Sequence, residues 1–114
     1  MDGLKDITGF SHLILLYHFH GVTGFQLLTK PFLDKEKKGI FSIRHCNRPN
    51  PIGLSVVRLL EVEKNILKIG DVDMLDKTPL LDIKPYVQEF DIKTGVKDGW
   101  YPAASERAKY AGKE

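Results

Sequence analysis

The apolar segments of this 114-residue chain are all short, and glycine or proline residues interrupt the sequence between them. Residues 11–19 (SHLILLYHF) carry aromatic and aliphatic side chains on both alternating faces, which is typical of a central strand covered on two sides. Composition and turn residues predict further strands at 39–44, 55–63, 66–69 and 80–86. Because no long helical pattern alternates with these strands, we expect a mostly β domain resembling a small barrel, with long loops.

The connecting segments complete this expected fold. Lys64 and Asn65 separate two strand patterns by two residues, which predicts an antiparallel hairpin. Polar residues at 21–38 and 89–97 predict exposed loops. Residues 105–113 predict a short, frayed C-terminal helix. We therefore expect a single domain over residues 1–100 and a tail over 101–114.

Composition bounds the possible functions. The hydrophobic fraction of 42% and the charged fraction of 28% are those of an ordinary soluble domain. The net charge of +2 neither indicates nor excludes a nucleic-acid partner, so any basic surface must be local. A single cysteine, Cys46, excludes an internal disulfide and fits a reducing cytoplasm. The longest apolar segment is too short to span a bilayer and the chain opens MDGLKD, so we expect no membrane association.

Two neighbouring polar segments carry the residues that look functional. In residues 44–55 (RHCNRPNPIGLS), Pro49 and Pro51 fix their own φ angles and restrict the residues before them, which predicts a preorganised loop. Residues 70–86 (GDVDMLDKTPLLDIKPY) contain four aspartates, followed by a lysine and a tyrosine beside prolines. This density of titratable groups predicts a site.

Three blocks of sequence, taken in order, resemble a known family. They are GLKDITGFSHLILLYHFH, RPNPIGLS and DMLDKTPLLDIKPY. Over roughly residues 3–100 the chain is similar to the TrmO (TsaA-like) family of β-barrel methyltransferases, and three blocks in order match by chance far more rarely than one short motif. The resemblance implies S-adenosylmethionine as cofactor, and methylation of N6-threonylcarbamoyladenosine beside the anticodon of tRNA as activity. It also implies a homodimer, because the family completes its pocket across a subunit interface.

The resemblance assigns roles to individual residues. It implies cofactor contacts from His20, Gly21, Arg44, Leu54, Asp76, Lys77 and Thr78. On the substrate side we expect Arg48 and Lys84 to meet phosphate, Asn50 to read a base edge and Tyr86 to stack on an extruded base. Asp76, Asp82 and Tyr86 are candidates for removing the proton of the acceptor nitrogen. Methyl transfer needs no metal, and none is expected.

The chain also departs from the family pattern. Full members begin with additional strands before the first block, and this chain contains none of that pattern. A barrel that lacks strands exposes unpaired edges, so either the chain is a truncated product or fragment, or a dimer interface covers these edges. Many members have Asp-Gly-Thr-Pro where this chain has Asp76, Lys77, Thr78 and Pro79. A lysine there requires either a negative φ or local strain of about 1 kcal/mol or more.

Other interpretations remain open from the sequence. His18 and His20 share one face of a strand and form a metal pair only if a third ligand exists. Cys46 as a nucleophile lacks an evident His and Asp arrangement. The Asp82, Ile83, Lys84 triplet resembles a metal-dependent nuclease motif. A non-catalytic RNA-binding or dimeric scaffold is the second hypothesis after the methyltransferase, and the nuclease is the third.

Overall fold

A computed structural model describes residues 2–21, 23–31 and 35–102 of the chain. Its contacts divide the chain into two units. The first unit contains residues 1–22 and 51–92, and the second contains residues 23–50 and 93–114. The Arg44 to Asn50 loop, which we call the RPN loop, therefore belongs to the second unit. Residues 70–86, the second polar segment, belong to the first unit.

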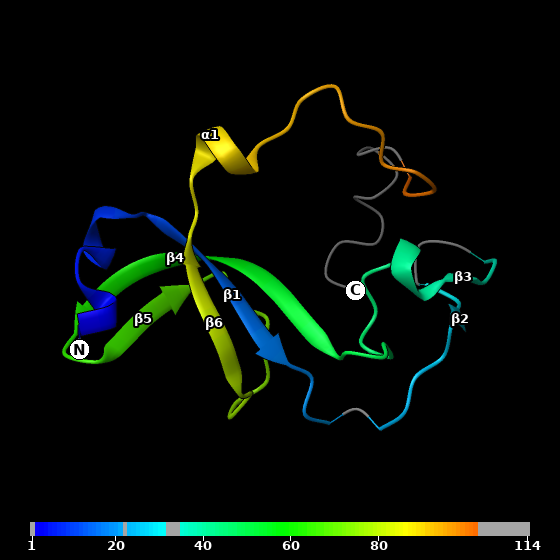
Figure 1. The fold of residues 1–114 in the computed structure, drawn as a ribbon, viewed down its shortest axis with the longest axis horizontal. Coiled ribbons are helices and arrows are strands. Elements are labelled where there is room, and N and C mark those ends of the chain that lie inside the picture. The colour runs from blue at the N-terminus through cyan, green and yellow to red at the C-terminus, as the bar shows by residue number, and fades with distance from the viewer. Residues whose placement is uncertain (1, 22, 32–34, 103–114) are drawn as a thin grey trace. The chain divides into compact units, whose positions relative to one another are not determined.

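The first unit is built on a four-stranded antiparallel sheet (Figure 1). Its strands are β1 (His12–His18), β4 (Ile52–Glu63), β5 (Ile66–Gly70) and β6 (Leu80–Pro85), in the order β5-β4-β1-β6. The predicted strand at 11–19 is confirmed as β1, and it is central. The hairpin between β4 and β5 is also confirmed, with Lys64 of its turn at a φ of 56°. The predicted strand at 80–86 is confirmed as β6.

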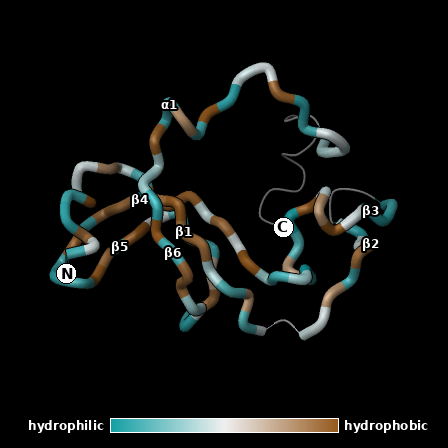
Figure 2. The backbone as a smooth tube through the Cα atoms, viewed as in Figure 1, coloured by the Kyte–Doolittle hydropathy of each residue, from teal (hydrophilic) through white to brown (hydrophobic). Residues whose placement is uncertain are grey.

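One face of this sheet carries the core. Leu13, Leu15 and Tyr17 of β1 alternate inward and pack with Val57 of β4, and all four are at most 7% exposed. Figure 2 shows hydrophobic residues concentrated along the strands of this unit. Side chains alternate along β4, so every second residue projects from the opposite face. We call this the open face, because an apolar row of β4 is exposed on it: Ile52, Leu54, Val56 and Leu60.

Two segments cover the core face. The 3-10 helices η1 (Asp2–Leu4) and η2 (Ile7–Gly9) contribute Ile7 to the core. Residues 71–79, which we call the β5–β6 loop, contribute Met74. Because β5 ends beside Arg58 while β6 starts beside Tyr17, this loop runs diagonally from one edge strand to the other.

The second unit differs from what the sequence predicted. Its strands β2 (Leu28–Thr29) and β3 (Lys38–Gly39) form a two-residue ladder, and the 3-10 helix η3 (Ile40–Ser42) follows. The predicted strand at 39–44 is therefore wrong. Ile40 and Ile43 are both buried, and residues three apart share one side of a 3-10 turn, whereas a strand would point them to opposite faces.

Two further outcomes concern the polar segments near the C-terminus. The loop predicted at 89–97 begins instead with the short helix α1 (Gln88–Asp91), where the Asp91 carboxylate accepts a 2.7 Å hydrogen bond from the Val87 N–H. The helix predicted at 105–113 lies outside the described residues. The mostly β prediction is confirmed, but the described strands form an open sheet and a two-stranded ladder rather than a closed barrel. None of the described helices is long and apolar enough to cross a membrane.

Candidate functional site

The β5–β6 loop contains a tight turn at the predicted cofactor residues. The Leu75 carbonyl accepts two hydrogen bonds from Thr78, one from the backbone N–H at 3.3 Å and one from the hydroxyl at 2.6 Å. Lys77, the third residue of the turn, has a φ of 64°. A positive φ at this position is typical of a type II turn and favours glycine. Of the two expectations for Lys77, a negative φ or a strained backbone, the structure therefore has the strained backbone.

A chain of side-chain hydrogen bonds ties this loop to the sheet. The Ser55 hydroxyl donates to a carboxylate oxygen of Asp73 at 3.1 Å, and the Tyr17 hydroxyl lies 2.8 Å from the Ser55 oxygen. Ser55 has one hydroxyl hydrogen, and Asp73 receives it, so the Tyr17 O–H donates to Ser55. Gly53 allows the approach of the Tyr17 ring, since a Cβ on Gly53 would lie 2.4 Å from a Tyr17 ring carbon.

The end of β1 lies beside the turn. The His18 N–H donates to the Pro79 carbonyl at 3.0 Å, and the Phe19 N–H donates to the Pro51 carbonyl at 2.8 Å. His20 and Gly21 follow directly and are exposed. The structure therefore brings the predicted cofactor residues that follow β1 and those of the turn to one end of the sheet. Leu54 is near this end but projects from the open face, opposite to Ser55.

The predicted substrate residues of β6 lie on another part of the sheet. Lys84 and Asp82 form a 3.1 Å ion pair. The hydrogen bond from Lys84, and then that from the Ile83 N–H, lowers the pKa of the Asp82 carboxyl. A lowered pKa makes a carboxylate a weaker base, so Asp82 is better suited to accept hydrogen bonds than to remove a proton.

Tyr86 is at the far end of β6. Its ring is 6.1 Å from the His12 ring, and its N–H donates to the His12 carbonyl at 3.2 Å. It lies six positions after Leu80, where β6 starts next to the turn. At roughly 3.3 Å per residue, Tyr86 is about 20 Å along the strand from that turn. Within the first unit, the structure does not bring Tyr86 and the turn together.

The RPN loop, in the second unit, is held by its own arginine. One terminal nitrogen of Arg48 donates to the Ile43 carbonyl at 2.7 Å and to the His45 carbonyl at 3.2 Å. The Arg48 guanidinium also lies 5.8 Å from the centre of the Phe41 ring, within cation–π range. Arg44 and Asn50 are exposed, and no ion pair joins Arg44 to a described residue of its own unit.

The sequence interpretation missed several of these residues. Ser55 and Asp73 were not among the candidates, because nothing in the spacing of residues 55 and 73 indicates that they meet. Phe41, 75% exposed beside Arg48, was not predicted either. The sequence signal that was available is an aromatic residue shortly before a loop with two arginines, Arg44 and Arg48.

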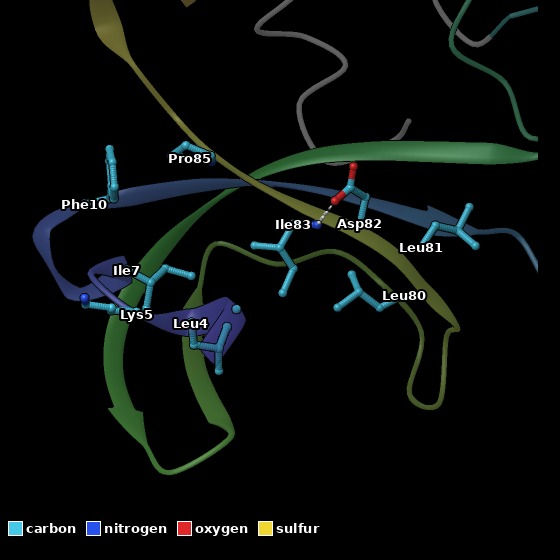
Figure 3. Close-up of a pocket in the computed structure, with 10 residues that line it drawn as sticks. Leu4, Lys5, Ile7, Phe10, Leu80, Leu81, Asp82, Ile83 and Pro85 are labelled. Carbon is cyan, nitrogen blue, oxygen red and sulfur yellow. Dashed lines mark hydrogen bonds between the residues drawn. The ribbon is translucent and has the colours of Figure 1, made fainter. Parts of the chain in front are cut away.

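The first unit also contains an apolar groove at the edge of β6. It has a volume of about 470 Å³ and lies between β6 and the N-terminal 3-10 helices, with Leu4, Ile7, Leu80 and Ile83 among its lining residues. Figure 3 shows Ile83 directed toward Leu4 and Ile7, and the Asp82 carboxylate directed away from them. The groove contains none of the predicted cofactor residues.

The described residues offer little for metal binding or for thiol chemistry. No group of three His, Cys, Asp or Glu residues among them is arranged to hold a metal ion. Cys46 is half-buried, with its sulfur 3.9 Å from a His45 ring nitrogen and 3.8 Å from the Asn47 side-chain oxygen. Both distances are long, so the contacts do not form a tight nucleophile and base pair.

Comparisons with known proteins bear on this arrangement. The family model of the tRNA-methyltransferase O N-terminal domain matches residues 1–92. A probable S-adenosyl-L-methionine-binding protein of Pyrococcus abyssi is 60% identical over 99 residues, which cover 87% of this chain and 54% of that protein. The tRNA (adenine(37)-N6)-methyltransferase of Escherichia coli is 39% identical over 94 residues, which cover 75% of this chain and 40% of that enzyme.

Solved structures agree with the sequence comparisons. The crystal structure of TrmO from Pseudomonas aeruginosa superposes with a TM-score of 0.72 at 36% identity, covering 89% of this chain and 42% of that one. The chain thus spans about half the length of the curated relative from Pyrococcus abyssi and less of the others named here. The resemblance found in the sequence motifs is confirmed, and the chain belongs to the tRNA-methyltransferase O N-terminal domain family.

Proposed function

We propose that this chain is an S-adenosylmethionine-dependent methyltransferase domain that methylates N6 of adenine 37 in tRNA. The observation that carries the proposal is the family match over residues 1–92, which include both polar segments. We further propose that the acceptor is N6-threonylcarbamoyladenosine, as the sequence resemblance implies. The names of the relatives support the coarser reaction, an adenine 37 methylation.

The turn of the β5–β6 loop fits the polar part of such a cofactor. Asp76 and Lys77 are exposed, and the Asp76 carboxylate engages no described residue. An unpaired carboxylate can accept hydrogen bonds from ribose hydroxyls or from the ammonium of the methionine portion. His20, Gly21 and Thr78, at the same end of the sheet, are the remaining proposed contacts there. Leu54, which projects from the open face, is proposed as an apolar contact on that face.

The RPN loop, in the second unit, carries the proposed cationic contacts. Arg44 is exposed and can form a bidentate pair with the cofactor carboxylate. Arg48 and Asn50 are proposed to hold the RNA, Arg48 through phosphate and Asn50 through a base edge. Arg48 keeps guanidinium N–H groups available, because its two loop hydrogen bonds use a single terminal nitrogen.

The bound cofactor supplies the reactive methyl group on a sulfonium. The protein contributes the positioning of the acceptor nitrogen and the exclusion of water, which together provide most of the rate enhancement of such a displacement. Asp82 and Lys84 are proposed to orient the substrate through their ion pair. Tyr86, distant from the turn, is proposed to stack on the RNA.

The oligomeric state and the cellular location are proposed from the same resemblance. We propose a homodimer in the cytoplasm, where tRNA is available, and the exposed apolar row on β4 is suited to a subunit contact. Sedimentation of the purified chain tests this directly. A dimer sediments at twice the chain mass of 12.9 kDa, and a strictly monomeric chain at micromolar concentration removes the dimer from the proposal.

Labelled methyl transfer tests the reaction. Three RNAs are offered with labelled S-adenosylmethionine: a tRNA carrying threonylcarbamoyladenosine at position 37, the same tRNA with unmodified adenosine, and one with another base there. Label on the first alone supports the full proposal, and label on the second supports the coarser reaction. RNA binding without label on any of them contradicts the proposal and favours the scaffold. Cleavage that stops on chelation favours the nuclease.

A further inference from the structure

The β5–β6 loop crosses the core face with few fixed points. Within the described residues, its ties to the sheet are the Met74 contact with the core, the hydrogen bond from His18 to the Pro79 carbonyl, and the Ser55 to Asp73 hydrogen bond. The last of these is the one that fixes the middle of the loop through a directional bond. It lies two residues before Leu75, where the turn begins.

We propose that Ser55 and Asp73 are positioning residues that hold the turn of residues 75–78 in the geometry that receives the cofactor. The inference rests on the proposed function and goes beyond it, because neither residue is among the proposed cofactor contacts. A hydrogen bond in this place restrains the loop before ligand arrives, and preorganisation of that kind increases affinity by lowering the ordering cost on binding.

The arrangement of Ser55 is itself constrained. Tyr17 is 7% exposed and packs edge-on against Phe19, with ring centres 5.7 Å apart. Its hydroxyl donates to the Ser55 oxygen, which leaves the Ser55 hydrogen directed to Asp73. Gly53 leaves room for the Tyr17 ring. A buried aromatic ring thus orients a half-buried hydroxyl toward an exposed loop carboxylate.

Four variants separate positioning from simple stability. Ser55→Ala removes the loop tie and leaves the buried Tyr17 hydroxyl without its partner. Adding Tyr17→Phe to it removes that orphaned hydroxyl, so stability recovers while the tie stays lost. Asp73→Asn retains an acceptor oxygen and serves as the conservative rescue. Ile69→Val removes one methyl group from the core side of β5 and is the control for lost stability alone.

The measurement is S-adenosylmethionine affinity by calorimetry, with the melting temperature of each variant beside it. We expect about tenfold weaker binding for Ser55→Ala, the effect of one ordinary hydrogen bond. The same loss is expected for the double variant despite its recovered melting temperature. Asp73→Asn and Ile69→Val should bind within about threefold of the unaltered chain. Affinity that follows the melting temperature across all four variants overturns the proposal.

Amide hydrogen exchange distinguishes failure of this inference from failure of the proposed function. If the unaltered chain binds no S-adenosylmethionine, the cofactor assignment fails, and exchange in residues 71–79 then decides whether the tie positions the loop. We expect faster exchange there in Ser55→Ala and in the double variant than in Ile69→Val. Equal exchange in all three contradicts the positioning role.

Discussion

The two loops that carry most of the predicted site residues are stabilised by different kinds of contact. The RPN loop is held from within, by Pro49 and by Arg48, which donates to carbonyls three and five residues before it. The β5–β6 loop is held from outside, by Ser55 and Tyr17 of the sheet, which are 18 and 56 residues away from Asp73 in sequence. Damage to the first should therefore stay local, whereas damage to the second should also reach the core of the sheet.

The largest effect is expected from Arg48→Ala. The change removes the hydrogen bonds of Arg48 to the Ile43 and His45 carbonyls and also the proposed phosphate contact. Methyl transfer should therefore fall by about 100-fold, the cost of a small misplacement of the reacting groups. The free energy of unfolding of the sheet should change by less than about 0.5 kcal/mol, because the Ile43, His45 and Phe41 groups that Arg48 contacts belong to its own unit and not to the sheet.

Arg58→Ala is the matched control for this variant. Arg58 is an exposed arginine of β4 without a proposed role, so both activity and stability should remain close to those of the unaltered chain. If Arg48→Ala retained full turnover, Arg48 would have no part in the site.

Gly53→Ala disturbs the hydrogen bonds from Tyr17 to Ser55 and from Ser55 to Asp73 that hold the β5–β6 loop. The added Cβ would meet Tyr17 ring carbons at 2.4 and 2.7 Å and a Phe19 carbon at 2.8 Å, so the ring that orients Ser55 must move. Overpacking of this kind costs about 1–3 kcal/mol of unfolding free energy, measured in urea. Gly9→Ala adds the same methyl group in open space and should change stability by less than about 0.5 kcal/mol. Equal stability of Gly53→Ala and Gly9→Ala would show that the Tyr17 ring can move without a cost in unfolding free energy.

Lys77 tests the strain in the turn. Lys77→Val places a β-branched residue at a φ of 64° and should cost about 1–2 kcal/mol, measured by thermal unfolding. Lys77→Gly relieves the strain, and this gain is offset in part by the greater entropy of the unfolded chain, so stability should rise by up to about 1 kcal/mol. A destabilised Lys77→Gly chain would indicate that the lysine side chain contributes more than the strain removes.

The smallest effect concerns the ion pair on β6. Lys84 lowers the pKa of Asp82 in the folded chain, so the pair contributes stability above the unfolded pKa of this carboxyl and loses it as the pH falls through the folded value. Lys84→Met should raise the Asp82 pKa toward its ordinary 3.8, followed by NMR of the carboxyl carbon. An unchanged titration would mean that the Ile83 N–H alone sets the pKa.

The contrast between the loops explains what sequence could predict. The period-2 pattern of residues 11–19 and the two-residue turn at Lys64 and Asn65 are local signals, and they predicted β1 and the β4–β5 hairpin correctly. Burial of both Ile40 and Ile43 depends on the packing of the second unit, so the local pattern there predicted a strand wrongly.

The same holds for the site. Pro49 in the RPN loop, Pro51 after it and the positions of Asp76 to Thr78 were evident from the residues and from the family motifs. The tie between Ser55 and Asp73 was not, because it depends on the diagonal path of the β5–β6 loop over the core face. That path is set by the order of strands in the sheet, which no short sequence pattern encodes.

Titration of S-adenosylmethionine into the 114-residue chain, followed by calorimetry, measures whether the chain binds the proposed cofactor. We expect saturable binding at one site per chain, displaced by S-adenosylhomocysteine. A chain that gives the dispersed NMR spectrum of a folded protein, yet releases no heat and shows no displacement, would contradict the claim that these two loops belong to a cofactor-binding methyltransferase domain.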